Sequence, residues 1–81
     1  MSKHFVSEED TQEIAIRFSY HPPTSGQKLR YGRLRAMAHD FAMVIMGDCP
    51  DSRERSTALT KLEEAVMHAN ASIARREEDD G

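Results

Sequence analysis

Prolines divide this chain into three segments, each of which can form a helix. Pro22 and Pro23 are adjacent, and Pro50 follows Cys49. Because proline lacks a backbone N–H and also pushes the preceding residue away from helical dihedral angles, no helix is expected to continue through these positions. Between the prolines, apolar residues recur at steps of three and four, as they do on one face of a helix. The sequence therefore predicts an all-α fold.

Capping residues indicate a short first helix. Ser7 is a plausible N-cap, and Asp10 three residues later resembles a capping box. The helix is expected to end at about Phe18, before the two prolines. Residues 19–26 are expected to form a stiff loop.

The second and third helices are predicted to be long. Thr24 and Gln27 match a capping box, so the second helix should start at about Thr24 or Ser25 and run to about Met46, with Gly47 ending it. Asp51, with an acidic residue three positions later, should open a third helix that reaches residue 75 or 76. Helices of roughly 22 and 25 residues joined by a short loop predict an antiparallel hairpin about 35 Å long.

The hairpin is expected to associate with further copies of itself. The predicted contact face of the second helix contains Leu34, Ala38, Phe41 and Ile45, widened by Met37 and Val44, and that of the third contains Leu59, Leu62, Val66, Ala69 and Ile73. Two helices enclose little interior. The many alanines allow close approach of helices, and the methionines add apolar surface that a single hairpin cannot bury. An oligomer is therefore expected, with the third helix as a main contact.

Length and charge exclude several classes of protein. A chain of 81 residues forms one small domain, and its net charge of −3 disfavours binding to a long nucleic acid. No apolar run approaches the roughly 18 residues that span a bilayer, so no membrane partner is expected. The first residues show no leader segment, and a single cysteine cannot form an internal disulfide, so the cytoplasm is the expected location.

No catalytic arrangement is visible, so the chain is predicted not to be an enzyme. The histidines form no metal-binding motif, and no cofactor or metal is expected. Cys49 is interpreted as a small buried residue, since no base and orienting group accompany it. Glu63 and Glu64 are consecutive helical residues and point in different directions, so they do not form an acid–base pair.

A cluster of basic and aromatic residues instead indicates an anion-binding site. Its members are Tyr20, His21, Lys28, Arg30, Tyr31 and Arg35. Aromatic rings that stack on bases, beside guanidinium groups that bind phosphate, are the usual means of holding a nucleotide. The alternatives are a solvated helix face, packed tyrosines and arginines paired with acids.

Three residues of the third helix are ambiguous. Asn70 lies on a largely alanine surface, where an amide either fixes the register of packing or contacts a ligand. Arg75 and Arg76 complement the helix dipole, which is a sufficient structural reason for their presence.

Three stretches carry a resemblance to a known family. They are RFSYHPP at 17–23, GQKLRYGRLR at 26–35 and CPDSRERSTALTKLEEAVMHANASIAR at 49–75. These stretches resemble the phage anti-CBASS cyclic-oligonucleotide sponges, whose hairpin also occurs in an anti-Thoeris sponge. The chain departs from many of these relatives at His68, where they often carry tryptophan.

The resemblance implies a function and an assembly. It implies a hexamer, built as a trimer of dimers, that sequesters the cyclic di- and trinucleotides of bacterial immunity without cleaving them. Dinucleotide pockets are shared by two protomers, and Tyr20 would stack on a base there. A basic residue would bind phosphate; Arg35 is preferred, with Lys28 or Arg30 as alternatives. Separate trinucleotide pockets form where three protomers meet, and Asn70, Arg75 and Arg76 are assigned to them.

The expected organisation is a single helical hairpin domain. It consists of an N-terminal extension with a short helix (1–16), a family-like core (17–76) and an acidic tail (77–81). Two other functions remain open: a helical module that inhibits or scaffolds a partner protein, and a nucleic-acid-binding hairpin. The acidic ends of the chain weaken the second of these.

Overall fold

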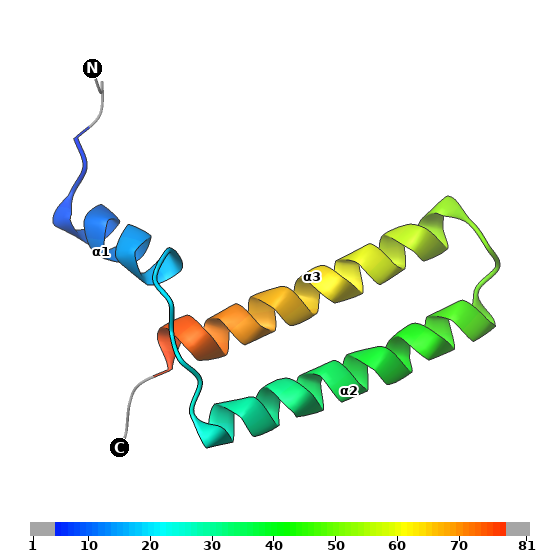
Figure 1. Ribbon diagram of the computed structural model, residues 1–81. Coiled ribbons are helices and arrows are strands. Elements are labelled where there is room, and N and C mark those ends of the chain that lie inside the picture. The colour runs from blue at the N-terminus through cyan, green and yellow to red at the C-terminus, as the bar shows by residue number, and fades with distance from the viewer. Residues whose placement is uncertain (1–4, 78–81) are drawn as a thin grey trace.

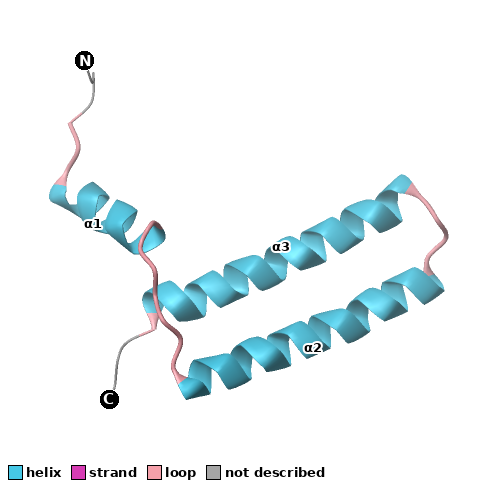
Figure 2. Ribbon diagram, viewed as in Figure 1, coloured by secondary structure: helices cyan, strands magenta, loops and turns pink. Residues whose placement is uncertain are grey.

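The computed structural model describes residues 5–77, and all three of its helices lie in this range. They are α1 (Glu8–Arg17), α2 (Ser25–Asp48) and α3 (Arg53–Arg76), and the described residues contain no strand. α2 and α3 lie side by side as a long hairpin, and α1 lies at the open end of the hairpin near the end of α3 (Figure 1, Figure 2). The predicted all-α hairpin is confirmed. Most of the expected acidic tail lies outside the described residues.

Two of the predicted capping boxes are present. At α1, the backbone N–H of Asp10 donates to Ser7 Oγ (3.0 Å), and the N–H of Ser7 donates to Asp10 Oδ2 (3.1 Å). At α2, the N–H of Gln27 donates to Thr24 Oγ1 (3.1 Å), and the N–H of Thr24 donates to Gln27 Oε1 (3.0 Å). Each box therefore satisfies two backbone donors that have no partner within the helix.

The predicted end of α2 at Gly47 is wrong. The helix continues to Asp48, and its C-cap is Cys49 in an extended conformation (φ −109°, ψ 137°), as the residue before a proline prefers. Arg55 Nη1 donates to the carbonyls of Met46 (3.3 Å) and Cys49 (3.2 Å). This contact from α3 supplies donors at the end of α2, so a terminating glycine is not needed.

The predicted N-cap of α3 is displaced by one residue. Ser52, not Asp51, is the N-cap, and its Oγ accepts from the N–H of Arg55 (3.0 Å). Asp51 Oδ1 instead lies 3.2 Å from Arg55 Nη2. Arg55 thus joins the end of α2, the connecting turn and the first turn of α3, and it closes this end of the hairpin.

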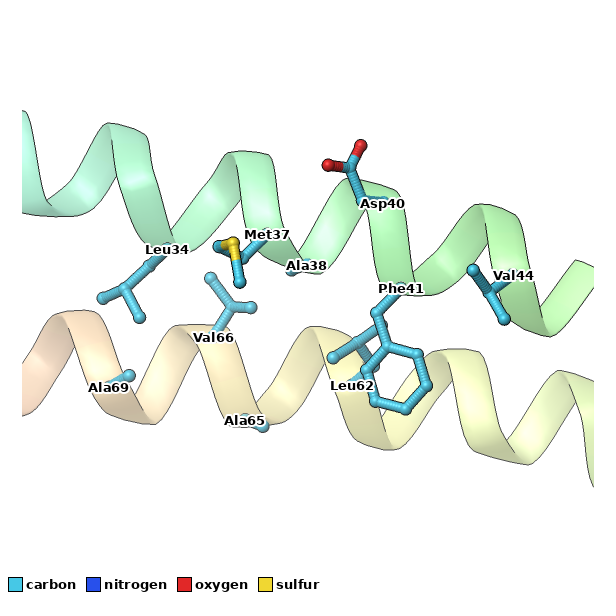
Figure 3. Close-up of a pocket in the computed structure, with 10 residues that line it drawn as sticks. All are labelled: Leu34, Met37, Ala38, Asp40, Phe41, Val44, Leu62, Ala65, Val66 and Ala69. Carbon is cyan, nitrogen blue, oxygen red and sulfur yellow. The ribbon is translucent and has the colours of Figure 1, made fainter.

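The seam between α2 and α3 differs from the predicted face at one position. Half-buried residues at the seam are Leu34, Ala38, Ala42 and Ile45 from α2, and Leu59, Leu62, Val66, Ala69 and Ile73 from α3. Phe41 was expected in this row but is 57% exposed, as are Met37 (67%) and Val44 (54%). These three exposed side chains line an apolar hollow of about 600 Å³ beside the seam (Figure 3). Ala42 takes the seam position because its small side chain lets the helices approach.

The hairpin encloses no fully buried residue among those described. The thinnest dimension of the chain is 14 Å, and its radius of gyration is 17.5 Å, against about 12 Å for a compact chain of this length. The accessible surface is 7101 Å², whereas a compact monomer of this mass exposes roughly 4,900 Å². The hairpin is therefore a single layer with much uncovered apolar surface. No helix within residues 5–77 is long and apolar enough to cross a membrane.

Replacing the cap of α2 should destabilise the hairpin. Thr24→Ala removes the acceptor for the N–H of Gln27 and should lower the free energy of unfolding by about 1 kcal/mol. Thr57→Ala is the matched control, because its hydroxyl donates to a carbonyl of its own helix, that of Arg53, and alanine favours the helix. Urea denaturation at one protein concentration, followed by circular dichroism, measures both. If Thr24→Ala and Thr57→Ala lowered the free energy of unfolding equally, the capping role of Thr24 would be contradicted.

Candidate ligand-binding site

A hollow of about 420 Å³ lies where the loop after α1 meets α2 and α3. We call it the tyrosine hollow; its lining residues are Ser19, Tyr20, His21, Tyr31, Arg35, Asn70, Ala71, Ala74 and Arg75. The structure therefore brings together four members of the predicted basic and aromatic cluster. It adds Asn70 and Arg75, which the sequence analysis had assigned to a different pocket.

Local structure explains how the lining residues reach one place. Tyr31 and Arg35 are four residues apart on α2, so they share one face of the helix. Ala71 and Ala74 of α3 leave space beside them. His21 Nε2 donates to the carbonyl of Ile16 (2.9 Å), which ties the proline-containing loop back to α1. The neighbouring Tyr20 side chain is 83% exposed, so its ring is accessible to a ligand.

Asn70 gives the tyrosine hollow an unused acceptor. Its Oδ1 is buried, and no donor within the described residues reaches it. A buried acceptor without a partner costs roughly 1–3 kcal/mol, so a donor from outside this chain would be favourable here. A base N–H of a ligand and a side chain of a neighbouring protomer both have the required chemistry.

Lys28 and Arg30 do not line the tyrosine hollow. Arg30 Nη1 and Nη2 donate to Glu77 Oε2 (2.5 Å) and Oε1 (2.6 Å). Gln27 Nε2 donates to the same carboxylate (3.2 Å) and to the carbonyl of Ile73 (3.4 Å). The hydrogen bond from Arg30, followed by that from Gln27, lowers the pKa of Glu77. These contacts join the start of α2 to the end of α3.

A second hollow, of about 510 Å³, lies between α1 and the last turns of α3. We call it the arginine hollow; its lining residues are Arg17, His68, Ala71, Ser72, Arg75 and Arg76. Ala71 and Arg75 line both hollows, so the two cavities are neighbours. Three guanidinium groups at one cavity indicate a site for an anion with several oxygens.

Glu13 of α1 holds the arginines at the edge of this hollow. Arg76 Nη1 and Nη2 donate to Glu13 Oε1 (2.8 Å) and Oε2 (2.6 Å), and Arg17 Nε donates to Oε2 (2.5 Å). The hydrogen bond from Arg76, and then that from Arg17, lowers the pKa of Glu13 from 4.5 to about 2. The hydrogen bond between Arg76 and Glu13 also raises the pKa of Arg76. Arg75 Nη2 also donates to the carbonyl of Arg17 (3.1 Å).

The part that α1 plays in the arginine hollow is not evident from the sequence. Glu13 and Arg17 are four residues apart, a spacing that signals an ion pair within one helix. Glu13 and Arg76 are 63 residues apart, and no local pattern indicates that they meet. His68, noted in the sequence only as a departure from the family, and Ser72 are not among the predicted site residues, although their spacing of one turn places them on one face of α3.

The two hollows offer binding groups, namely rings, guanidinium groups and amide or hydroxyl oxygens. Within residues 5–77, no group of three or more His, Cys, Asp or Glu side chains is placed to hold a metal ion. Cys49 is exposed at the opposite, closed end of the hairpin, so the expectation that it is buried is wrong. It is exposed because the turn before Pro50 has no layer packed over it. The arrangement suits stacking and anion binding.

Acid should release α1 from α3. The pKa of Glu13 is about 2 in the folded chain and 4.5 for an unperturbed carboxyl, so its ion pairs stabilise the docked helix fully above pH 4.5. This stabilisation is lost as the pH falls from 4.5 towards 2. We expect the NMR titration of the Glu13 side-chain carbon to have its midpoint clearly below pH 4.5, because the hydrogen bonds from Arg76 and Arg17 lower the pKa of Glu13. Amide exchange in α1 should rise over the same range, and a midpoint near 4.5 would contradict the contact.

Acidification protonates other carboxyls, so the titration needs a control. Glu13→Gln removes the titrating group and keeps the shape of the side chain. The part of the rise in α1 exchange that depends on Glu13 should be absent from this variant, because its α1 is already held more weakly at neutral pH.

Comparison with known proteins identifies the family. The family model described as Acb2/Tad1, hairpin domain, matches residues 10–74, which include α2, nearly all of α3 and most of α1. No curated protein and no solved structure matches the chain. Since the matched range covers most of the chain, the chain belongs to the Acb2/Tad1 hairpin family, the family of the anti-CBASS and anti-Thoeris sponges.

Proposed function

We propose that this chain is a phage anti-defence protein that sequesters cyclic di- and trinucleotide messengers of the CBASS immune system in the cytoplasm of the infected bacterium. It binds these messengers without cleaving them. The observation that carries the proposal is the tyrosine hollow, in which Tyr20, Tyr31 and Arg35 meet in a chain of the sponge family.

The tyrosine hollow is the proposed site for a cyclic dinucleotide. The exposed ring of Tyr20 stacks on a base, with Tyr31 as a second aromatic surface and His21 beside it. Arg35 binds phosphate. It is favoured over Arg30 because Arg30 is engaged with Glu77, and over Lys28 because Lys28 does not line the hollow. Asn70 Oδ1 accepts a hydrogen bond from a base N–H.

Symmetry explains why one chain supplies only part of the dinucleotide site. A cyclic dinucleotide has two bases and two phosphates around a near-twofold axis. A twofold interface offers each half of such a ligand the same residues from each protomer. A hollow of about 420 Å³ that is open on one side fits a site completed by a second copy.

The arginine hollow is the proposed site for a cyclic trinucleotide. Arg75 and Arg76 line it together with Arg17, and a ring with three phosphates presents several oxygens to such a cluster. Asn70 lines the tyrosine hollow, not this one, and we therefore move it to the dinucleotide site.

The proposed assembly is a hexamer formed as a trimer of dimers. The hairpin has an apolar hollow of about 600 Å³ containing Met37, Phe41 and Val44, and another of about 380 Å³ containing Ala42 and Met67. The two share seam residues but otherwise have different linings. Two apolar hollows offer surface to more than one neighbour, and a closed assembly of several copies provides such neighbours.

Recovery of unchanged ligand is the main test. We expect purified protein to remove cyclic di-AMP or cyclic tri-AMP from solution, and protease digestion of the complex to return the intact ligand in full. A cleaved product would show an enzyme and contradict sequestration. If no cyclic nucleotide binds and a bacterial protein is captured instead, the alternative of a helical interaction module is supported.

Tyr20→Ala should weaken dinucleotide binding while leaving the assembly intact. Loss of base stacking is expected to cost about 1–3 kcal/mol, measured by calorimetry with cyclic di-AMP. Tyr20→Phe keeps the ring and should retain most of the affinity. Unchanged affinity of Tyr20→Ala, with the oligomer intact by sedimentation, would remove Tyr20 from the site.

A further inference from the structure

The Glu13 carboxylate is hydrogen-bonded to the guanidinium group of Arg76, which an anion in the arginine hollow would also contact. Both of its carboxylate oxygens accept from Arg76, at 2.8 and 2.6 Å, and Arg17 donates to one of them. The side chains of Glu13 and Arg76 are 35% and 46% exposed. Solvent and solutes therefore reach this ion pair, and a competing anion can replace the carboxylate.

The geometry of the pair is that of a bound oxyanion. An arginine binds a carboxylate and a phosphate in the same way, with two parallel N–H donors on two oxygens. Glu13 thus presents to Arg76 what a ligand phosphate would present, and it is held next to the hollow by α1. Glu13 takes the end-on pair of donors, one on each Nη of Arg76, so an anion that approaches this pair must compete with the carboxylate.

We propose that Glu13 is an internal competitor for the arginine hollow, so that a phosphate-bearing ligand reaches the end-on donors of Arg76, one on each Nη, only by displacing the Glu13 carboxylate. The inference rests on the proposed function of that hollow. Under this proposal α1, which lies mostly in the N-terminal extension, lowers the affinity of the arginine hollow for anions.

Displacement of Glu13 has a consequence for α1. Two contacts join α1 to α3 at this point, one between Glu13 and Arg76 and one between the Arg17 carbonyl and Arg75. Breaking the first leaves α1 more weakly held. Binding at the arginine hollow should therefore loosen α1, whereas most ligands protect the elements that they contact. Only molecules in which Glu13 is undocked can bind the ligand at these donors. The apparent affinity of the arginine hollow is therefore proportional to the fraction of molecules in that state.

The competition also distinguishes the two hollows. Glu13 contacts Arg76 and Arg17, and neither residue lines the tyrosine hollow. A dinucleotide in the tyrosine hollow has no need to displace the carboxylate. Glu13 thus acts on the affinity of one site and leaves the other unchanged.

The test compares wild-type protein with Glu13→Gln, using cyclic tri-AMP for the arginine hollow and cyclic di-AMP for the tyrosine hollow. We expect Glu13→Gln to raise the affinity for cyclic tri-AMP roughly three- to fivefold, as fits an exposed ion pair, and to leave cyclic di-AMP binding unchanged. Glu9→Gln makes the same change of charge one turn earlier on α1 and should give a smaller gain. Hydrogen exchange in wild-type α1 should increase when cyclic tri-AMP is added.

Each other outcome overturns the inference. Weaker cyclic tri-AMP binding by Glu13→Gln would show that Glu13 positions the arginines, and an unchanged affinity would show that it does not compete. Glu13→Asp keeps the charge but shortens the side chain, and an affinity outside the range set by wild type and Glu13→Gln would count against competition. If cyclic di-AMP binds but no variant binds cyclic tri-AMP, this inference fails and the dinucleotide site stands. If neither ligand binds, the proposed function fails with it.

Discussion

The packing of one long helix on another, in a single layer 14 Å thick, governs the rest of this structure. Small residues such as Ala38 and Ala42 bring the helices together at the seam, but a two-helix layer cannot surround any side chain. The larger apolar groups of α2, including Met37 and Phe41, are left on the surface. In the proposed assembly these groups are buried against other copies, and the proposed binding sites are completed by a second chain for the same reason.

The open end of the hairpin is held by charged side chains, and this is where the binding groups gather. Arg30 joins the start of α2 to Glu77, while Arg76 joins the end of α3 to Glu13 of α1. These ion pairs fix the two termini of the hairpin without closing a core between them. The loop carrying Tyr20 runs between α1 and α2 and is positioned by both. Arg75 lines both hollows, so the two cavities are neighbours that share one side chain.

The elements that depend on local chemistry could be predicted from the sequence. The prolines and the Ser7 and Thr24 capping boxes place the helices, and the four-residue spacing of Tyr31 and Arg35 places both at one cavity. Features that depend on contacts between distant residues could not be predicted in this way. Periodicity alone cannot choose Ala42 over Phe41 at the seam, because they follow Ala38 by four and three residues, and both steps occur along an apolar helix face. The continuation of α2 past Gly47 depends on Arg55, and the pairing of Glu13 with Arg76 joins opposite ends of the chain.

Native mass spectrometry with a cyclic dinucleotide tests the central claim most directly, because it reports the number of chains and the mass of what they hold in one spectrum. The account predicts a closed assembly of several chains, with six as the proposed number, carrying whole-number additions of the uncleaved ligand mass. A single chain that carries no ligand, or an assembly that carries only fragments of the ligand, would contradict it.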